Sequence, residues 1–509
     1  MAVIYKQTVE NLSERRIDAW HYHPNFQNQI DKIKQNIGVI FLNDVIDKFR
    51  GVASGATPLG ANYLQNGKVK FYRTSEVEGM ILDSEKAVYI SKEDDEKLAR
   101  SRLKAGDILL TITGAKFGKS AVVSELHLPG NISQHSVRFH PKPELIDSYF
   151  LVAYLESNIG QDVIWREAYG ATRPAIDFPS VRALTIPKVN LIAQKYIGDK
   201  VRQAELLRQF AKFKQLRIES IFNKKVLDLG YKYKAPTKYI RCNLDNRLDP
   251  AYYAATYSFL DEEWFRNASQ KLKSYIDNGS YGVLPSSNSY GLGTEKFIRA
   301  TDLSSANINS KSYTLVPFEE VSAKAKVSTG DILLEIKGAI SECQLSTHYL
   351  DGTYVNGSIY RFKPKDIDAA YLTFYLRSFI KKLYCDRVSV NNIISYLDLE
   401  SIHNLPILRL DSEIENIISD EFLLIELANR LSFRATKTAK YLVEALIEGV
   451  ITEEELIQAQ NALEQGDASL DRAILSQMTE DGYAVAGSKP LFSDLDEFYD
   501  LLEQAKALE

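Results

Sequence analysis

The sequence has few cysteines, few histidines and no long apolar run. Its three cysteines, Cys242, Cys343 and Cys385, lie far apart, and neither they nor the seven histidines have the close spacing of a zinc site. Scattered cysteines in an odd number are typical of a reducing compartment, so we expect a cytoplasmic protein. No stretch of ~18 apolar residues is present, which argues against a transmembrane helix. The first residues lack the apolar core of a secretory signal, and we expect none.

The chain also lacks an excess of basic charge, since its net charge is −5. The excess of acidic residues lies at its C-terminal end. Residues 449–509 carry 14 acidic and three basic side chains, whereas the first 448 residues carry 53 acidic and 59 basic ones. The body of the chain is therefore mildly basic, which permits phosphate binding without requiring it.

A long internal repeat is the strongest signal in the chain. Segments of the first half return in the same order roughly 222 to 231 residues later, and the block Gly-Asp-Ile-Leu-Leu occurs at both 106–110 and 330–334. The flanking matches pair residues 16–18 with 247–249, 70–77 with 296–303, and 136–141 with 358–364. Ordered self-similarity of this kind indicates two copies of one domain, and 509 residues are in any case too many for one ordinary core.

Each copy has the pattern of an α/β or α+β domain followed by a long helix. The Gly-Asp-Ile-Leu-Leu blocks open short apolar strands, and residues 149–157 and 371–378 predict short buried helices. Each copy closes on a strand that contains proline. Residues from 191 to about 224, and from 414 to 445, then carry apolar side chains at helical spacing. Two such helices would bury their apolar stripes most simply against each other.

The order of domain, long helix, domain, long helix resembles the specificity subunits of type I restriction–modification systems. The resemblance covers roughly residues 12 to 448. It rests on the duplicated Gly-Asp-Ile-Leu-Leu blocks and on a strand ending in Ile186-Pro187 that leads into a helix with Ala193-Gln194. It implies two similar α/β (α+β) target recognition domains, each reading one half of a bipartite, asymmetric site in double-stranded DNA. A pair of long antiparallel helices, a coiled coil, would separate them and fix the distance between the half-sites.

The resemblance also implies that the chain is a non-catalytic part of a phage-defence complex. Two DNA adenine methyltransferase subunits would dock on it, together with restriction (nuclease/translocase) subunits where the system has them. S-adenosylmethionine would bind to the methyltransferases, so we expect no cofactor on this chain. The interpretation divides the chain into five parts: target recognition domains at 1–189 and 233–410, long helices at 190–232 and 411–448, and an acidic helical extension at 449–509.

Three fragments imitate catalytic motifs, and the repeat provides an internal control. Residues 114–120 resemble a phosphate-binding loop but have three residues between the glycines instead of four. Asp331 and Glu335 resemble an acidic metal pair. The first copy has Thr111 in place of Glu335, so we expect alternating residues on a solvated strand face instead. Residues 249–252 resemble the Asp-Pro-Pro-Tyr element of amino-methyltransferases without its second proline. We predict no catalytic residue and no metal.

Polar loops are the places where bases or phosphates could be bound. The candidates are Lys116, Lys119, Gln134, His135, Thr172 and Arg173 in the first copy, and Asn288, Tyr290, Lys337, Asn356, Ser389, Asn391 and Asn392 in the second. Any one of them could equally be a solvated loop residue. The loops at 170–174 and 389–393 differ between the copies, as loops that read different bases should. Arg73 and Arg299 recur in both copies, which suits a shared phosphate contact or a structural salt bridge.

The sequence leaves the roles of two features open. His21 and His23 could lie on one strand face, although a surface or packing role is favoured. The acidic extension begins with a capping box at Thr452 and Glu455, and it could dock on a partner, imitate the charge of DNA or simply cap the chain. Two rival functions are a stand-alone DNA-modifying enzyme, against which the missing cofactor motifs count, and a two-domain scaffold that does not read DNA.

Overall fold

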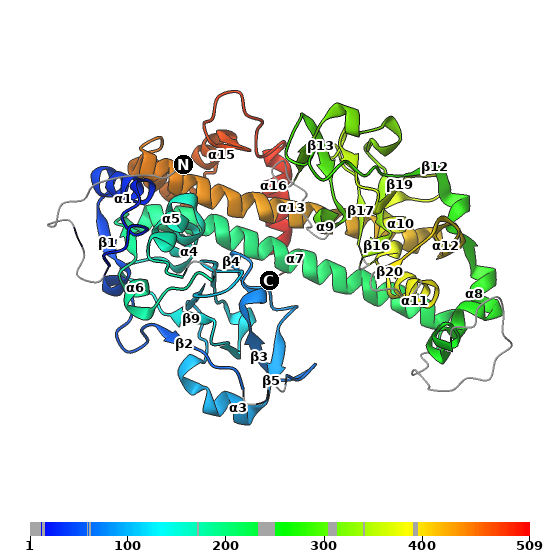
Figure 1. Cartoon of the computed structure of the whole chain (residues 1–509), viewed down its shortest axis with the longest axis horizontal. Helices are drawn as coiled ribbons and strands as arrows, with labels where there is room; N and C mark the ends of the chain where they lie inside the picture. The colour runs from blue at the N-terminus through cyan, green and yellow to red at the C-terminus, as the bar shows by residue number, and fades with distance from the viewer. Residues whose placement is uncertain are drawn as a thin grey trace. The chain divides into compact units, whose positions relative to one another are not determined.

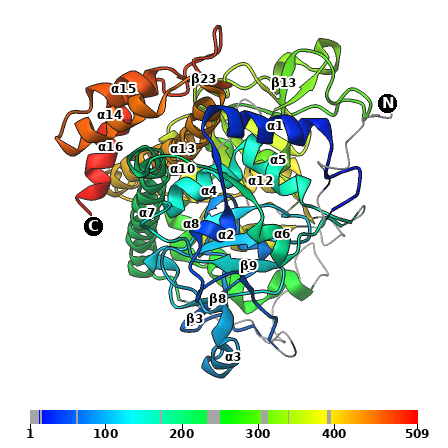
Figure 2. The same cartoon turned by 90° about the vertical axis from the view of Figure 1, so that its left-hand side faces the viewer.

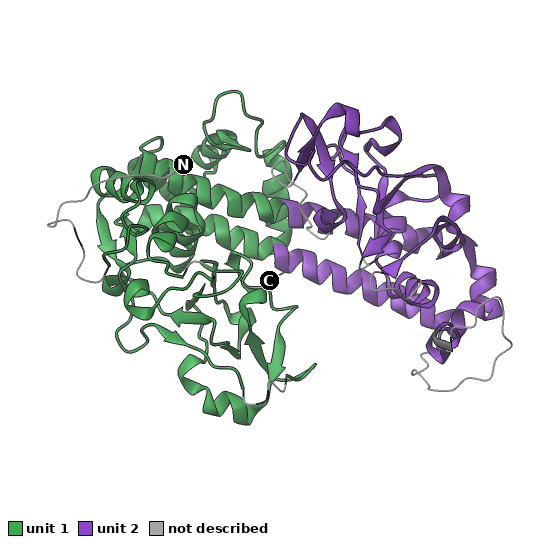
Figure 3. Cartoon of the chain, in the orientation of Figure 1, with its two compact units in different colours: residues 1–207, 431–509 green, residues 208–430 purple. Residues whose placement is uncertain are grey.

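The computed structural model describes residues 12, 16–58, 60, 63–170, 173–232, 250–303, 313–338, 340, 342–389 and 395–508. The chain forms two compact units (Figures 1 and 3). Unit 1 comprises residues 1–207 with 431–509, and unit 2 comprises residues 208–430. The chain passes from one unit to the other inside two long helices, α7 (Leu191–Asp228) and α13 (Ser412–Glu448). Within the described ranges, no helix combines the length and the apolar character needed to span a bilayer.

Unit 1 contains a five-stranded and a three-stranded sheet. The five strands follow the order β2 (Ala53–Ser54), β9 (Ser136–Phe139), β6 (Ile108–Thr111), β7 (Ser120–Val122) and β4 (Met80–Ile81). The three strands are β5 (Val88–Ile90), β3 (Val69–Tyr72) and β8 (Gly130–Ile132), where β3 pairs antiparallel with β5 and parallel with β8. A separate ribbon joins β1 (Val39–Phe41) to β10 (Thr185–Pro187).

Unit 2 repeats this arrangement, with four strands in its larger sheet where unit 1 has five. Its larger sheet has the order β12 (Ile276–Tyr281), β19 (Ile359–Pro364), β15 (Ile332–Glu335) and β17 (Cys343–Leu345). In its smaller sheet, β13 (Glu295–Ile298) pairs antiparallel with β14 (Thr314–Val316) and parallel with β18 (Tyr354–Val355). The closing ribbon joins β11 (Ser269–Lys271) to β21 (Pro406–Leu408), and a short ribbon joins β16 (Lys337–Gly338) to β20 (Ser395–Tyr396). The predicted duplication is therefore confirmed in the fold.

The predicted buried helices are also present. They are α4 (Ser148–Glu156) and α10 (Ala369–Leu376), and in each an aspartate caps the first turn. Asp147 accepts two backbone N–H groups at 2.9 Å, and Asp368 does the same. The remaining helices of the two copies are α1 (Pro24–Asn36), α2 (Leu42–Val45), α3 (Lys92–Lys97), α5 (Asn158–Arg166), α6 (Phe178–Arg182), α8 (Glu263–Ala268), α9 (Ala300–Leu303), α11 (Phe379–Val388) and α12 (Leu399–Asn404).

The two long helices pack against each other, as their apolar spacing predicts. In unit 2 the Arg217 guanidinium lies 2.9 Å from Glu421, and the Lys225 ammonium lies 3.7 Å from Asp411. The residue numbers rise on one helix while they fall on the other, so the pair is antiparallel. In unit 1 the Ser432 hydroxyl donates to the Ala204 carbonyl at 2.8 Å, between fully buried side chains. These contacts confirm the predicted pair.

The acidic extension folds onto the helices of unit 1. Its elements are α14 (Glu453–Glu464), α15 (Ser469–Ser476), the ribbon β22 (Met478–Thr479) with β23 (Gly482–Tyr483), and α16 (Leu495–Lys506), and Figure 2 shows its helices grouped beside α7 and α13. The predicted capping box is confirmed, since Thr452 and Glu455 each accept the other's backbone N–H. The extension thus caps its own chain, one of the three roles that the sequence left open.

A buried ion pair anchors the extension. The Asp471 carboxylate is fully buried and accepts hydrogen bonds from the Lys200 ammonium and the Tyr196 hydroxyl at 2.6 Å, and from the Tyr499 hydroxyl at 2.5 Å. Burial alone would raise the pKa of Asp471, but the Lys200 charge and these hydrogen bonds outweigh it, so the pKa is lowered. A buried charge is tolerated here because its partners compensate it.

We expect Asp471→Asn to lower the free energy of unfolding by about 3–5 kcal/mol, because the buried Lys200 ammonium would lose its counter-charge. Urea denaturation followed by circular dichroism measures the loss. Asp500→Asn, on the exposed side of α16, should change stability by less than about 0.5 kcal/mol. Replacing both partners with Lys200→Met and Asp471→Leu should recover most of the loss. Equal stability of the two asparagine variants would contradict an anchoring role.

Candidate nucleic-acid interface

Four loops of unit 1 converge at one edge of the five-stranded sheet. The Ile112 N–H donates to the His135 carbonyl at 2.9 Å, and the Ile176 N–H donates to the Ile112 carbonyl at 3.1 Å. The Thr57 N–H donates to the Gln134 side chain at 3.2 Å. These bonds join the loop after β6 to the loops before β9, after β2 and around residue 170, so candidates that lie far apart in the sequence share one edge.

Unit 2 builds the equivalent edge, and two of its backbone bonds match those of unit 1. The Ile336 N–H donates to the Ser358 carbonyl at 3.0 Å, and the Leu397 N–H donates to the Ile336 carbonyl at 2.9 Å. The Val283 N–H donates to the Val355 carbonyl, which adds the loop after β12. Each copy therefore presents a similar platform of loops whose side chains differ.

Among the first-copy candidates, Lys116, His135 and Arg173 have exposed side chains, and Gln134 is exposed while its carbonyl oxygen holds Thr57. Arg173 follows Gly170, whose φ is +91° and whose added Cβ would lie 2.6 Å from the Arg173 carbonyl. Only glycine suits that turn. Thr172 lies outside the described residues.

Lys119 has a structural partner. Its ammonium donates to Glu156 at 2.9 Å, and the Glu156 side chain is fully buried and also accepts the Ser120 N–H at 2.6 Å. Residues 114–120 do not form a phosphate-binding loop, because residues 112–119 connect two antiparallel strands, β6 and β7, instead of leading into a helix.

The second-copy candidates divide in the same way. Asn288 and Lys337 are exposed, whereas Ser389 is buried at the end of α11. Tyr290 packs its ring edge-on to Phe297 at 5.9 Å between ring centroids. Asn356 uses its side-chain oxygen to accept the Ser358 N–H at 2.8 Å. Asn391 and Asn392 lie outside the described residues.

The predicted solvated face for Asp331 and Glu335 is wrong. Both carboxylates are buried, and the whole of β15 between them is buried too. Asp331 is compensated by the Arg361 guanidinium at 2.8 Å, whereas Glu335, at the other end of the strand, approaches the Glu342 N–H at 3.4 Å. The two carboxylates are thus held apart by a strand and have separate partners.

Arg73 and Arg299 each form a local salt bridge, which was one of the two roles that the sequence suggested for them. Arg73 lies 2.8 Å from Glu76, and Arg299 lies 3.2 Å from Asp302, in each case three residues along the chain. Each carboxylate also accepts the backbone N–H of its own arginine. The recurrence of these arginines therefore has a local structural cause.

The favoured packing role of the histidine pair is observed. His21 is buried, and burial together with the nearby Arg166 and Arg16 lowers its pKa to about 4, so its ring is neutral at pH 7. His23 caps α1 by accepting the Asn25 N–H at 3.3 Å. Neither residue lies in a strand of the described structure.

Two exposed aromatic residues beside these loops were not among the contact residues predicted from the sequence. Tyr169 is 51% exposed and pairs its backbone with Ala175 around the loop of Arg173. Tyr396 is 40% exposed on β20, directly opposite Lys337. An amphipathic ring next to a cationic side chain suits contact with sugars, phosphates or bases.

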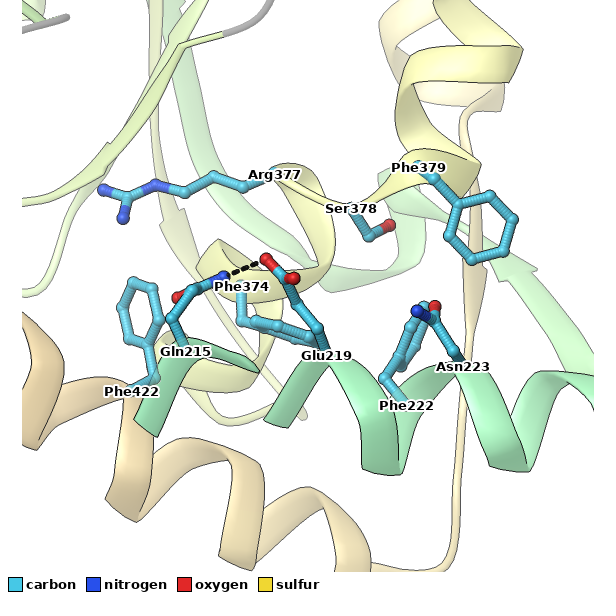
Figure 4. Close-up of a pocket in the computed structure, with 9 residues that line it drawn as sticks. All are labelled: Gln215, Glu219, Phe222, Asn223, Phe374, Arg377, Ser378, Phe379 and Phe422. Carbon is cyan, nitrogen blue, oxygen red and sulfur yellow. Dashed lines mark hydrogen bonds between the residues drawn. The ribbon is translucent and has the colours of Figure 1, made fainter. Parts of the chain in front are cut away.

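A cavity of about 240 Å³ lies elsewhere in unit 2 (Figure 4). It is lined by Gln215, Glu219, Phe222, Asn223, Phe374, Arg377, Ser378, Phe379 and Phe422, from the long helices and the α10–α11 segment. None of the candidate DNA-contact residues lines it, so the cavity is separate from the loop edge. Within the described residues, no three His, Cys, Asp or Glu side chains gather as metal ligands.

The family profile and the curated relatives point to the same family. Residues 34–219 match the profile of the type I restriction modification DNA specificity domain. The chain is 25% identical over 211 residues to the type I restriction enzyme MjaVIII specificity subunit of Methanocaldococcus jannaschii, covering 41% of this chain and 48% of that protein. It is 26% identical over 162 residues to the EcoBI specificity subunit of Escherichia coli, covering 32% and 33%. The matches thus span about half or less of these relatives' length.

A solved structure, that of the type I restriction-modification system S subunit from M. genitalium, aligns with 82% of this chain and 97% of its own length. The TM-score is 0.42 and the sequence identity 13%. The resemblance that the sequence suggested is confirmed by the family profile and by the curated relatives.

The ion pair with Glu156 separates Lys119 from the cationic candidates Lys116 and Arg173. We expect Lys116→Ala and Arg173→Ala each to weaken DNA binding at every sequence, and each to reduce the slope of log affinity against log salt by about one. Fluorescence anisotropy with a labelled duplex over a salt series measures both effects.

Lys119→Ala is the matched control, because its main effect should be a loss of about 1–3 kcal/mol in stability when the buried Glu156 carboxylate loses its cationic partner and keeps only the Ser120 hydrogen bonds. A Lys119 variant that is fully stable but binds DNA less well, beside unaffected Lys116 and Arg173 variants, would contradict this assignment.

Proposed function

We infer, from a chain whose residues 34–219 carry a type I restriction modification DNA specificity domain, that this protein recognises DNA sequence for a type I restriction–modification system. The observation that carries the proposal is the repeated loop edge. Two copies of one scaffold hold equivalent loops by equivalent backbone bonds, and the side chains on those loops differ. Two similar readers with different side chains suit an asymmetric site of two unlike halves.

In this proposal the first half-site is read by the edge that carries Lys116, Gln134, His135 and Arg173. The second is read by the edge that carries Asn288 and Lys337. Arginine and lysine would bind phosphates, while the amides and the histidine would bind base edges. Tyr169 and Tyr396 would add contacts to sugars or bases.

The chemistry would belong to partner subunits. DNA adenine methyltransferase subunits would dock on this chain and bring S-adenosylmethionine, and restriction subunits would join them where the system has them. Of the two carboxylates that imitate a metal pair, Asp331 is paired with Arg361 and Glu335 lies at the far end of the strand. The loop that imitates a phosphate-binding loop is a hairpin connection. Both features support a reader without catalytic residues of its own.

A domain exchange tests the two-reader proposal. Replacing residues 238–409 with the matching region of another specificity subunit should change one half of the recognised site and leave the other half unchanged. Methylome sequencing of cells that carry the chimera and its methyltransferase reads both halves at once. A change in both halves, or in neither, would refute independent reading.

Catalytic inertness is a second expectation. The purified chain, supplied with S-adenosylmethionine or ATP, should neither methylate nor cut a duplex, because its candidate catalytic groups are engaged in the fold. Adding the methyltransferase subunit of the same system should produce methylation at the bipartite site. Robust methyl transfer by the chain alone would favour the stand-alone enzyme.

A further inference from the structure

One four-residue segment has the same place and the same support in both copies. It follows the outer strand of the larger sheet, as residues 55–58 after β2 in unit 1 and residues 282–285 after β12 in unit 2. Each segment begins with glycine and ends with a buried proline. A Cβ on Gly55 would lie 1.7 Å from a backbone oxygen of β8, and a Cβ on Gly282 would lie 2.2 Å from one of β18. Only glycine allows so close an approach, so the two segments can be compared residue by residue.

The third residue of the segment differs between the copies, and so does the residue that it meets. In unit 1 the Thr57 N–H donates to the Gln134 side chain at 3.2 Å. In unit 2 the third residue is Leu284, and a Cβ on Gly357 would lie 3.0 Å from the Leu284 Cγ. Gln134 and Gly357 are equivalent, since each directly precedes the residue whose carbonyl accepts the bond from the loop after β6 or β15. A polar pair in copy 1 thus corresponds in copy 2 to an apolar side chain above a glycine.

The backbone around Leu284 is fixed, although the leucine side chain is 76% exposed. The Val283 N–H donates to the Val355 carbonyl at 3.0 Å, and the Gly357 N–H donates to the Val283 carbonyl at 2.8 Å. Pro285, on the other side, disfavours helical backbone at Leu284. A side chain whose backbone is held in this way loses little further freedom when it binds a partner.

Leu284 lies within the loop edge of unit 2. Gly357, which it contacts, precedes Ser358, and the Ser358 carbonyl accepts the Ile336 N–H at 3.0 Å. The exposed Lys337 follows directly, so a duplex held by this lysine would also meet the leucine. A leucine side chain neither donates nor accepts a hydrogen bond, so it can read a base only by apolar contact. The 5-methyl group of thymine is the apolar feature that bases present in the major groove.

We propose that Leu284 is a specificity-determining residue of the second copy, which selects thymine at one position of its half-site by contact with the 5-methyl group. The hydroxyl of Thr57 and the amide of Gln134, at the equivalent place in copy 1, suit hydrogen bonds to a base edge instead. The proposal rests on the proposed function for the reading of DNA. It adds a residue outside the polar candidates, the base that this residue selects and the chemical group that it contacts.

Removing the methyl group and removing the leucine test the same contact. Methylome sequencing first gives the bipartite site, and each thymine of both half-sites is then replaced in turn by deoxyuridine, which lacks only the 5-methyl group. The full-length chain, assembled with its methyltransferase subunits, is titrated with these duplexes by fluorescence anisotropy. We expect one replacement, in the half-site that the exchange of residues 238–409 alters, to weaken binding about fourfold, the effect of leaving about one methyl group unburied.

Leu284→Ala should weaken binding to the thymine duplex by a similar factor. It should also make binding insensitive to that deoxyuridine, because both changes remove one and the same contact. Leu145→Ala is the matched control. Leu145 is 43% exposed and follows β9 at the end away from the loop edge, so its variant should keep both the affinity and the preference for thymine.

An exchange of the pair gives a second, independent variant. Leu284→Thr combined with Gly357→Gln gives copy 2 the pair of copy 1, and the smaller threonine makes room for the new glutamine side chain. This double variant should lose the preference for thymine over deoxyuridine at the one sensitive position. Methylome sequencing of cells that carry it should show a changed base preference at that position and an unchanged half-site for copy 1.

The outcomes separate this proposal from the proposed function. Equal losses of the Leu284→Ala variant on thymine and deoxyuridine duplexes would overturn the proposal while leaving DNA reading intact. The same conclusion would follow if no thymine of the second half-site depended on its methyl group. If the unaltered complex bound its site no better than an unrelated duplex, the proposed function would fail together with the proposal.

Discussion

The pairing of α7 with α13 is the contact on which the rest of the structure depends. Each copy ends in a helix whose apolar stripe is too long for its own domain to cover. In unit 1 the stripe includes Val201, Leu207 and Leu442, all fully buried, and in unit 2 it includes Ile218 and Ile418, equally buried. Each such side chain contributes roughly 1.5–3 kcal/mol when it leaves water. A single copy would leave this stripe exposed, so the duplication supplies each long helix with the surface that it needs.

Much of this architecture was predictable because its signals are local or repeated. Apolar spacing predicted the long helices, and the paired Gly-Asp-Ile-Leu-Leu blocks predicted equivalent strands, which are β6 and β15. Thr452 and Glu455 predicted a helix start because a capping box involves only neighbouring residues. The duplication was visible in the same way, since comparing the two halves of the sequence requires no knowledge of the fold.

The partners of individual charges were not predictable, because they come from distant segments. No residue near Lys119 in the sequence indicates that Lys119 forms an ion pair with the buried carboxylate of Glu156. The buried state of Asp331 depends on Arg361, which arrives on the neighbouring strand β19. Several candidates, such as Lys116 and Asn288, are exposed on loops as the sequence suggested. Separating them from side chains that are engaged in ion pairs or hydrogen bonds of the fold, such as Lys119, required the structure. Tyr169 and Tyr396 were missed for the related reason that an aromatic residue in sequence is more often part of a core.

The loops of each edge are joined mainly through peptide groups, as in the bonds from Ile112 to His135 and from Ile336 to Ser358. A peptide N–H or carbonyl is present whatever side chain the residue carries, proline excepted. Substitutions can therefore change the exposed side chains of these loops without altering the backbone bonds that support them. One fold can therefore present many different sets of loop side chains while the bonds that support the loops stay the same.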